Sequence, residues 1–181
     1  EALPLLSRLF DGTYTTEHRM LLSVEVDGAH YGEALNDVAL LKRETGSMIT
    51  LYARLADTEL ASYECDGLVI STPSGSTAYS LSAYGPLMMP QVRAMLITPI
   101  APHSLTMRPL VIPEDETIEL TVSARNNTFL IVLDGQTKIL PCGAKITIRK
   151  SVNSLCLLHL DSYSFTDTLR KKLLWAAPVR E

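Results

Sequence analysis

The sequence opens with hydrophobic residues at helical spacing. These residues recur every three or four positions and would share one face of a helix: Leu3, Leu5, Leu6, Leu9 and Phe10. The pattern stops at Asp11-Gly12, and glycine is the residue preferred just beyond the end of a helix. We therefore predict a short amphipathic helix at the beginning of the chain.

From Thr13 the pattern changes to the alternation of hydrophobic and polar residues that is typical of strands. Asp27-Gly28 and Asp134-Gly135 have the composition of two-residue hairpin turns. The predicted strands are 19–26, 31–41, 48–56, 59–63, 68–70, 94–100, 110–112, 117–124, 129–133, 136–140, 145–149 and 154–160. So many short strands with closely spaced turns predict a mainly β, multi-stranded, sandwich-like domain.

The central segment from Cys65 to Pro86 combines a buried strand with a turn of small residues. The apolar run 68–70 is followed by Ser71-Thr72-Pro73 and a Ser74-Gly75 corner, which we call the elbow. A helix is predicted next, with Ser76 or Thr77 as its cap, ending at Gly85-Pro86. Such an elbow directs backbone N–H groups and hydroxyls to one point, and Gly75 would allow a ligand to approach the backbone closely. Asp66 and Tyr79 are expected to flank the elbow.

Near the end of the sequence, Phe165, Leu169, Leu173 and Leu174 recur at helical spacing and Trp175 closes the run. We predict a terminal amphipathic helix, which needs a surface on which to bury its apolar face.

The composition narrows the class of protein. The 181 residues are 46% hydrophobic with a net charge of −4, which fits a globular domain and argues against a nucleic-acid binder. Residues 67–92 contain no charged side chain but are too rich in Ser, Thr, Pro and Gly to span a membrane. A site lined by neutral polar groups explains this segment better.

The three cysteines, Cys65, Cys142 and Cys156, have no metal-ligand spacing. We expect free thiols in a reducing cytoplasm and no metal site. No basic-then-apolar leader opens the sequence, so nothing in it predicts secretion.

Two further clusters of polar residues lie within or next to the predicted strands. Asn36-Asp37 lies inside an apolar strand, where it could hydrogen-bond sugar hydroxyls or an exocyclic amine, or mark a bulge or a strand end. Glu114-Asp115-Glu116 follows Pro113 and is interpreted as a solvated turn.

The segment TPSGSTAYSLSAYGP, preceded by DGLVIS, closely resembles the signature of the NAD kinase family. That signature is usually Thr-Pro-Thr-Gly-Ser-Thr-Ala-Tyr behind an Asp-Gly, and the one departure here is Ser74 in place of threonine. The resemblance extends from about Leu22 to Trp175. It implies the C-terminal domain of the NAD kinase/diacylglycerol kinase-like fold, with a short N-terminal helix, one helix after the signature and a C-terminal helix.

The resemblance also implies a dinucleotide site. The family carries an Asn-Glu or Asn-Asp pair at Asn36-Asp37, a pocket-lining backbone at Ala101, and an Asp-Gly-Gln at Asp134-Gly135-Gln136 whose Gln reaches a nucleotide. The implied NAD-binding residues are Asn36, Asp37, Asp66, Ser74, Thr77, Ala78, Tyr79, Ser80, Ser82, Ala101 and Gln136.

NAD kinases transfer the γ-phosphoryl group of ATP, or of polyphosphate in some members, to the 2′-hydroxyl of the adenosine ribose of NAD. The resemblance therefore implies NAD as substrate, NADP as product, ATP with a divalent metal (Mg²⁺ or Mn²⁺), and a homodimer or homotetramer. The family's general base is an Asp in a Gly-Gly-Asp-Gly-Thr loop of a preceding α/β domain, and this sequence has no such loop. We thus predict no catalytic residue and no metal ligand in this chain, and no activity of the chain alone.

The expected organisation is an interdomain helix or linker at 1–20, the NAD-binding β domain at 21–162, and a segment at 163–181. That last segment would pack on the α/β domain or on the β domain itself. The alternatives are the second domain of a lipid or sphingoid kinase, and a catalytically inactive nucleotide-binding or assembly module.

Overall fold

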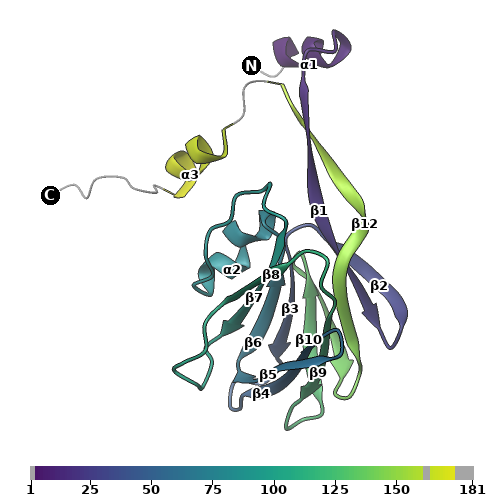
Figure 1. The fold of residues 1–181 in the computed structure, drawn as a ribbon, viewed down its shortest axis with the longest axis vertical. Helices are drawn as coiled ribbons and strands as arrows, with labels where there is room; N and C mark the ends of the chain where they lie inside the picture. The colour runs from purple at the N-terminus through teal and green to yellow at the C-terminus, as the bar shows by residue number, and fades with distance from the viewer. Residues whose placement is uncertain (1–2, 161–163, 174–181) are drawn as a thin grey trace, which may run out of the picture. The chain divides into compact units, whose positions relative to one another are not determined.

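The computed structural model describes residues 3–160 and 164–173 (Figure 1). Twelve strands, three α-helices and one 3₁₀ helix form in this part of the chain. Their order is α1 (Leu3–Phe10), β1 (Thr15–Val26), β2 (Ala29–Ala34), β3 (Asp37–Lys42), β4 (Ile49–Leu55), β5 (Thr58–Cys65), β6 (Gly67–Ser71), η1 (Ser74–Thr77), α2 (Tyr79–Ser82), β7 (Ala94–Ile100), β8 (Leu110–Pro113), β9 (Ile118–Ser123), β10 (Thr128–Leu133), β11 (Gln136–Pro141), β12 (Ile146–His159) and α3 (Phe165–Leu173).

The strands form two six-stranded sheets, which confirms the predicted mainly β architecture. Sheet 1 has the order β2-β1-β12-β9-β4-β5, and sheet 2 has the order β11-β10-β3-β6-β7-β8. All neighbouring strands of sheet 2 pair antiparallel. Both Asp-Gly turns have positive φ at each residue (52° and 79° at Asp27-Gly28, 43° and 85° at Asp134-Gly135), as their sequence predicts.

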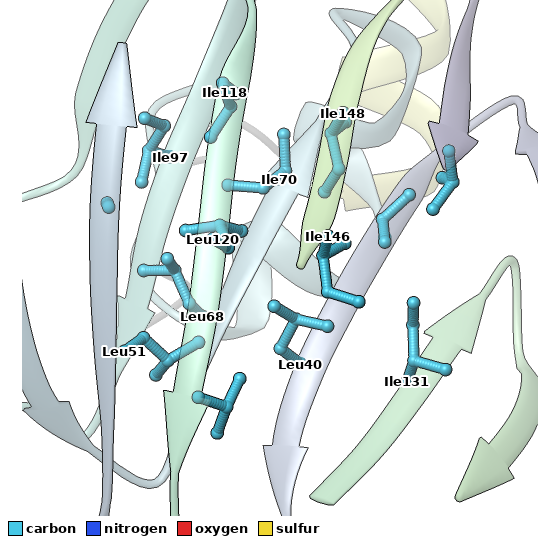
Figure 2. Packing of buried hydrophobic residues seen from close by; sticks show 14 of the residues in the cluster. Leu40, Leu51, Leu68, Ile70, Ile97, Ile118, Leu120, Ile131, Ile146 and Ile148 are labelled. Carbon is cyan, nitrogen blue, oxygen red and sulfur yellow. The ribbon is translucent and has the colours of Figure 1, made fainter. Parts of the chain in front are cut away.

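The core lies between the inner faces of the two sheets. Figure 2 shows Leu51, Ile118 and Ile146 of sheet 1 packed with residues of sheet 2. Strands β4 and β9 alternate buried and exposed residues, as expected for a sheet with one solvated face. All five residues of β6 are buried instead, because η1 and α2 cover the outer face of sheet 2 (Figure 1). This covered outer face carries the elbow.

The chain divides into two compact units, and the boundary falls within β1 and β12. One unit contains Arg19–Leu155, and the other contains the described residues up to His18 and from Cys156 onward. In the second unit, α1 ends at Phe10, as predicted just before Asp11-Gly12, and Gly12 has a φ of 69°. The predicted terminal helix is present as α3, but Leu174, Trp175 and the rest of the predicted segment beyond residue 173 lie outside the described residues.

Three predicted elements differ from the structure in their limits. The predicted strand 31–41 breaks after Ala34, and β3 begins at Asp37 in the opposite sheet. The two predicted strands within 145–160 are one continuous strand, β12. The predicted helix after the elbow is split into η1 and the four-residue α2, because Ala78 between them has non-helical dihedral angles (φ −102°, ψ −126°).

The predicted turn at Glu114-Asp115-Glu116 is present, but the prediction that it is solvated is wrong for Glu114. Glu114 is only 8% exposed, and its carboxylate lies 2.6 Å from Arg93 Nε and 2.8 Å from Lys150 Nζ. A buried carboxylate requires such partners, since burial of an unpaired charge is strongly unfavourable. Glu114 thus links β8 to the loop before β7 and to β12.

We predict that Glu114→Gln lowers the free energy of unfolding by about 1–3 kcal/mol at neutral pH, because both cations lose their anionic partner. Hydrogen bonds from Lys150 and then Arg93 lower the pKa of Glu114 from its ordinary 4.5, although burial opposes them. The stabilisation is therefore complete above pH 4.5 and is lost as the pH falls through the lowered pKa. Urea unfolding from pH 3 to pH 7 measures this. The exposed neighbour provides the control, Asp115→Asn, and identical pH profiles for the two variants would contradict the assignment.

Candidate functional site

The elbow is held by the hydroxyl of Thr72. Thr72 Oγ1 donates a hydrogen bond to the carbonyl of Leu35 (2.6 Å) and accepts one from the N–H of Gly75 (3.1 Å). The Thr72 N–H donates to the carbonyl of Asn36 (2.9 Å). The elbow is therefore fastened to the segment that joins β2 to β3, which we call the corner (residues 35–37).

The predicted helix cap is wrong. Ser76 is fully buried; its hydroxyl donates to the Pro73 carbonyl (2.7 Å) and accepts from the Met88 N–H (3.0 Å). The Thr77 hydroxyl donates to the Ser74 carbonyl (3.2 Å), and the residue before α2 is Ala78, without any side-chain capping bond. These hydroxyls thus serve local packing rather than a helix terminus.

The corner requires glycine at position 75. A Cβ atom on Gly75 would lie 1.9 Å from the carbonyl oxygen of Asn36, far inside van der Waals contact. The close approach that the sequence suggested for a ligand is filled by the backbone of the corner. The elbow and the corner consequently pack backbone against backbone.

Asn36 and Asp37 lie at the corner, beside the elbow. Asp37 is the first residue of β3, pairs with Ser71 at the end of β6, and is 6% exposed. Burial raises the pKa of the Asp37 carboxyl, a hydrogen bond from the Tyr79 N–H opposes this rise, and the negative charge of Asp134 adds to it. A buried carboxylate with a raised pKa next to an exposed aromatic side chain (Tyr79) is a functional-site candidate.

Sequence reasoning missed two charged residues at this place. Arg19 of β1 is 7% exposed, and its Nη1 donates to the Ser74 hydroxyl (3.1 Å), which places a cation behind the elbow. Asp134 accepts hydrogen bonds from all three N–H groups of the corner. No local pattern could have identified them, because Arg19 is 55 residues from Ser74 and Asp134 is 97 residues from Asp37.

The far end of α2 borders a second part of the candidate site. Ser82 and Ala101 line a hollow of about 570 Å³ together with Tyr84, Pro99 and Arg108. Ala101 has a φ of 44°, an unfavourable conformation for a non-glycine residue that is often found at functional sites. Ser80 faces inward instead: it is fully buried, and its hydroxyl lies 2.9 Å from that of Thr98.

Two predicted site residues lie away from the elbow. Asp66 precedes β6, so five strand residues, about 16 Å of extended chain, separate it from the elbow at the other end. It pairs with Lys42 (2.6 Å), and its N–H donates to Ile100, next to Ala101. Gln136 lines a separate hollow of about 310 Å³ between β2 and the β10–β11 hairpin. The predicted site residues therefore lie at three places. Those at the elbow are Asn36, Asp37, Ser74, Thr77, Ala78 and Tyr79. Ser82, Ala101 and Asp66 lie near the hollow beyond α2, and Gln136 lies at the third place.

The described residues offer no group of three or more His, Cys, Asp and Glu that could hold a metal ion. No helix in the same part of the chain is long and apolar enough to cross a membrane. The three cysteines are free thiols, and burial raises the pKa of Cys65 to about 11, which leaves its thiol protonated and unreactive at neutral pH.

Comparison with known proteins gives consistent results. The family model described as the ATP-NAD kinase C-terminal domain matches residues 35–160. An NAD kinase of Porphyromonas gingivalis is 53% identical over 181 residues, which cover 99% of this chain and 63% of that protein. An NAD kinase of Bacteroides fragilis is 39% identical over 178 residues, or 97% of this chain and 61% of that protein. The chain therefore spans somewhat less than two thirds of the length of these relatives.

Solved structures show the same fold. The yeast NADH kinase complexed with NADH superposes with a TM-score of 0.91 at 25% identity, over 98% of this chain and 54% of that one. An NAD kinase from Archaeoglobus fulgidus in complex with ATP superposes with a TM-score of 0.74 at 28% identity, over 87% of this chain and 60% of that one.

We predict that Gly75→Ala lowers the free energy of unfolding by about 2–3 kcal/mol, because the added methyl group overlaps the Asn36 backbone and must displace it. Gly46 is the matched control, since a Cβ there meets no atom within 4 Å and its φ is not positive, so Gly46→Ala should change stability by less than about 0.5 kcal/mol. Chemical denaturation of both variants measures the difference. Equal stability of the two variants would show that the Asn36 backbone does not exclude a side chain at position 75.

Proposed function

The chain belongs to the ATP-NAD kinase C-terminal domain family, and on this premise we propose that the whole protein is an NAD kinase. It transfers the γ-phosphoryl group of ATP to the 2′-hydroxyl of the adenosine ribose of NAD, and the product is NADP. This chain supplies the NAD-binding domain. The observation that carries the proposal is the packing of the Asn36-Asp37 corner against the elbow, since this joins the two most specific motifs in one place.

The site residues have distinct roles in this proposal. The Asn36 amide and the Asp37 carboxylate hydrogen-bond the ribose hydroxyls of NAD, for which they offer donors and acceptors at a fixed separation. The Tyr79 ring, which is 39% exposed, provides a face for a planar base. Arg19 and the elbow supply positive potential and hydroxyl groups for the charged part of the dinucleotide.

The hollow beyond α2 accommodates a further part of the ligand. The backbone of Ala101 and the Ser82 side chain line it, and Asp66 lies near its edge. Gln136 lies in the separate hollow beside the β10–β11 hairpin, and we assign it a nucleotide contact there.

The general base and the phosphoryl donor site belong to the part of the protein that this chain does not contain. Phosphoryl transfer requires a base for the accepting hydroxyl and a divalent metal, Mg²⁺ or Mn²⁺, on the phosphates. The described residues do not form a set of ligands for that metal, so we assign it to no residue of this chain. We also propose a homodimer or homotetramer in the cytoplasm.

We predict that the purified whole protein forms NADP from NAD and ATP in the presence of Mg²⁺, whereas the 181-residue chain alone forms none. An enzyme-coupled assay for NADP measures both. Failure of the whole protein to form NADP with ATP or polyphosphate would reject the proposed activity. A rise in melting temperature with a lipid substrate and not with NAD would instead favour a lipid kinase.

We predict that Asp66→Asn weakens NAD binding about tenfold but costs less than about 1 kcal/mol of stability, since the partly exposed Lys42–Asp66 pair contributes little. Calorimetric titration with NAD and urea unfolding separate the two effects. The exposed turn residue Asp57 gives the control variant, Asp57→Asn, which should bind NAD normally. Unfolding of the Asp66→Asn domain would show that Asp66 is structural.

A further inference from the structure

The N–H groups and the carbonyl groups of the corner have their hydrogen-bond partners on different elements. β2 ends at Ala34 in sheet 1 and β3 begins at Asp37 in sheet 2, so Leu35 and Asn36 alone connect these two strands. Leu35 and Asn36 belong to neither strand, and their N–H and C=O groups find partners outside the sheet ladders. They find them on two different elements.

The donors of the corner all meet one carboxylate. The N–H of Leu35 donates to Asp134 Oδ2 (2.6 Å), and those of Asn36 and Asp37 donate to Asp134 Oδ1 (2.8 and 3.1 Å). The Asp134 N–H donates in return to the Asp37 carbonyl (3.1 Å). Successive N–H groups that converge in this way form an anion-binding nest, and here the anion is a side chain of the β10–β11 hairpin.

The acceptors of the corner meet the elbow. The carbonyls of Leu35 and Asn36 accept hydrogen bonds from the hydroxyl and the N–H of Thr72. The corner is therefore a short link with Asp134 on one side and the elbow on the other. A shift of the corner away from Asp134 would move both the Asn36-Asp37 pair and the elbow.

The second Asp-Gly hairpin shows that the turn itself does not require this arrangement. Asp27 occupies the same type of turn with a φ of 52°, and within the described part of the chain its carboxylate accepts one backbone hydrogen bond, from the N–H of Lys145 (2.9 Å). The two aspartates have the same turn geometry, but their carboxylates accept hydrogen bonds from different backbone groups.

We propose that Asp134 is a positioning residue for dinucleotide binding: its carboxylate fixes the corner and thereby aligns Asn36 and Asp37 with the elbow. The inference rests on the proposed function for its ligand, NAD. Its structural part, the coupling of the corner to the elbow through Asp134, is independent of that function.

The decisive variant is Asp134→Asn in the whole protein. Asn-Gly is a preferred sequence for this turn, so the hairpin keeps its fold. The carboxamide, however, offers one oxygen in place of two and turns an N–H₂ donor toward a backbone donor. We expect NAD affinity to fall about 10- to 100-fold, as when a charged acceptor of several backbone hydrogen bonds is lost. Asp27→Asn is the matched control and should bind NAD normally.

Amide hydrogen exchange tests the coupling without any ligand. In Asp134→Asn, exchange should accelerate in peptides covering residues 33–38 and also in those covering 72–80, whereas Asp27→Asn should change neither. Thermal unfolding of both variants reports the structural cost of each substitution.

The outcomes are distinct. Faster exchange at both segments together with weakened NAD binding supports the proposal. Activity measured at varied NAD concentration also supports it if the KM for NAD rises more than kcat falls. Unchanged exchange at 72–80, or unchanged NAD affinity despite faster exchange, overturns it. Failure of the unsubstituted protein to bind NAD rejects the proposed function instead, and the exchange comparison then still decides whether Asp134 couples the corner to the elbow.

Discussion

The geometry of the candidate site depends on the hydrogen bonds of one short crossing between the two sheets. Leu35 and Asn36 carry the chain from β2 in sheet 1 to β3 in sheet 2. Asp134 accepts hydrogen bonds from its N–H groups, and Thr72 donates hydrogen bonds to its carbonyls. Gly75 must be glycine because the Asn36 carbonyl occupies the space of a side chain. The same crossing brings Asn36-Asp37 to the elbow.

The burial of β6 on both faces explains the neutral character of its five residues, 67–71. The outer face of β6 is covered by η1 and α2, so charged side chains have no place there. The hydroxyls of Ser76 and Ser80 are bonded internally, to Pro73 and Thr98 among others. Neutral polar residues in this segment thus satisfy the backbone of a tightly packed elbow, while the charges at the site come from distant strands.

Those charges surround the elbow from three elements. Arg19 comes from β1, Asp37 from β3 and Asp134 from the β10–β11 turn. Because Asp37 is buried, its pKa is raised, and the Tyr79 N–H at the start of α2 opposes that rise. The elbow supplies the scaffold, and the surrounding strands supply the electrostatics that a charged dinucleotide would meet.

The sequence by itself determined the features that depend on a few neighbouring residues. Helix α1 ends just before Asp11-Gly12 and both Asp-Gly pairs form their turns, because glycine adopts positive φ without steric cost and aspartate tolerates it better than most residues. Alternating hydrophobicity identified most of the strands, and the elbow motif indicated the family.

Only the tertiary structure decided the break at Leu35-Asn36, the burial of Glu114 and the continuity of β12. In each case the local pattern fits either outcome, and the choice depends on partners far along the chain. The corner breaks where Asp134 can accept its N–H groups 97 to 99 residues away, and Glu114 is buried where Lys150 reaches it from β12. Hydrogen bonds and ion pairs over such separations follow from how the two sheets pack, which no local window of the sequence contains.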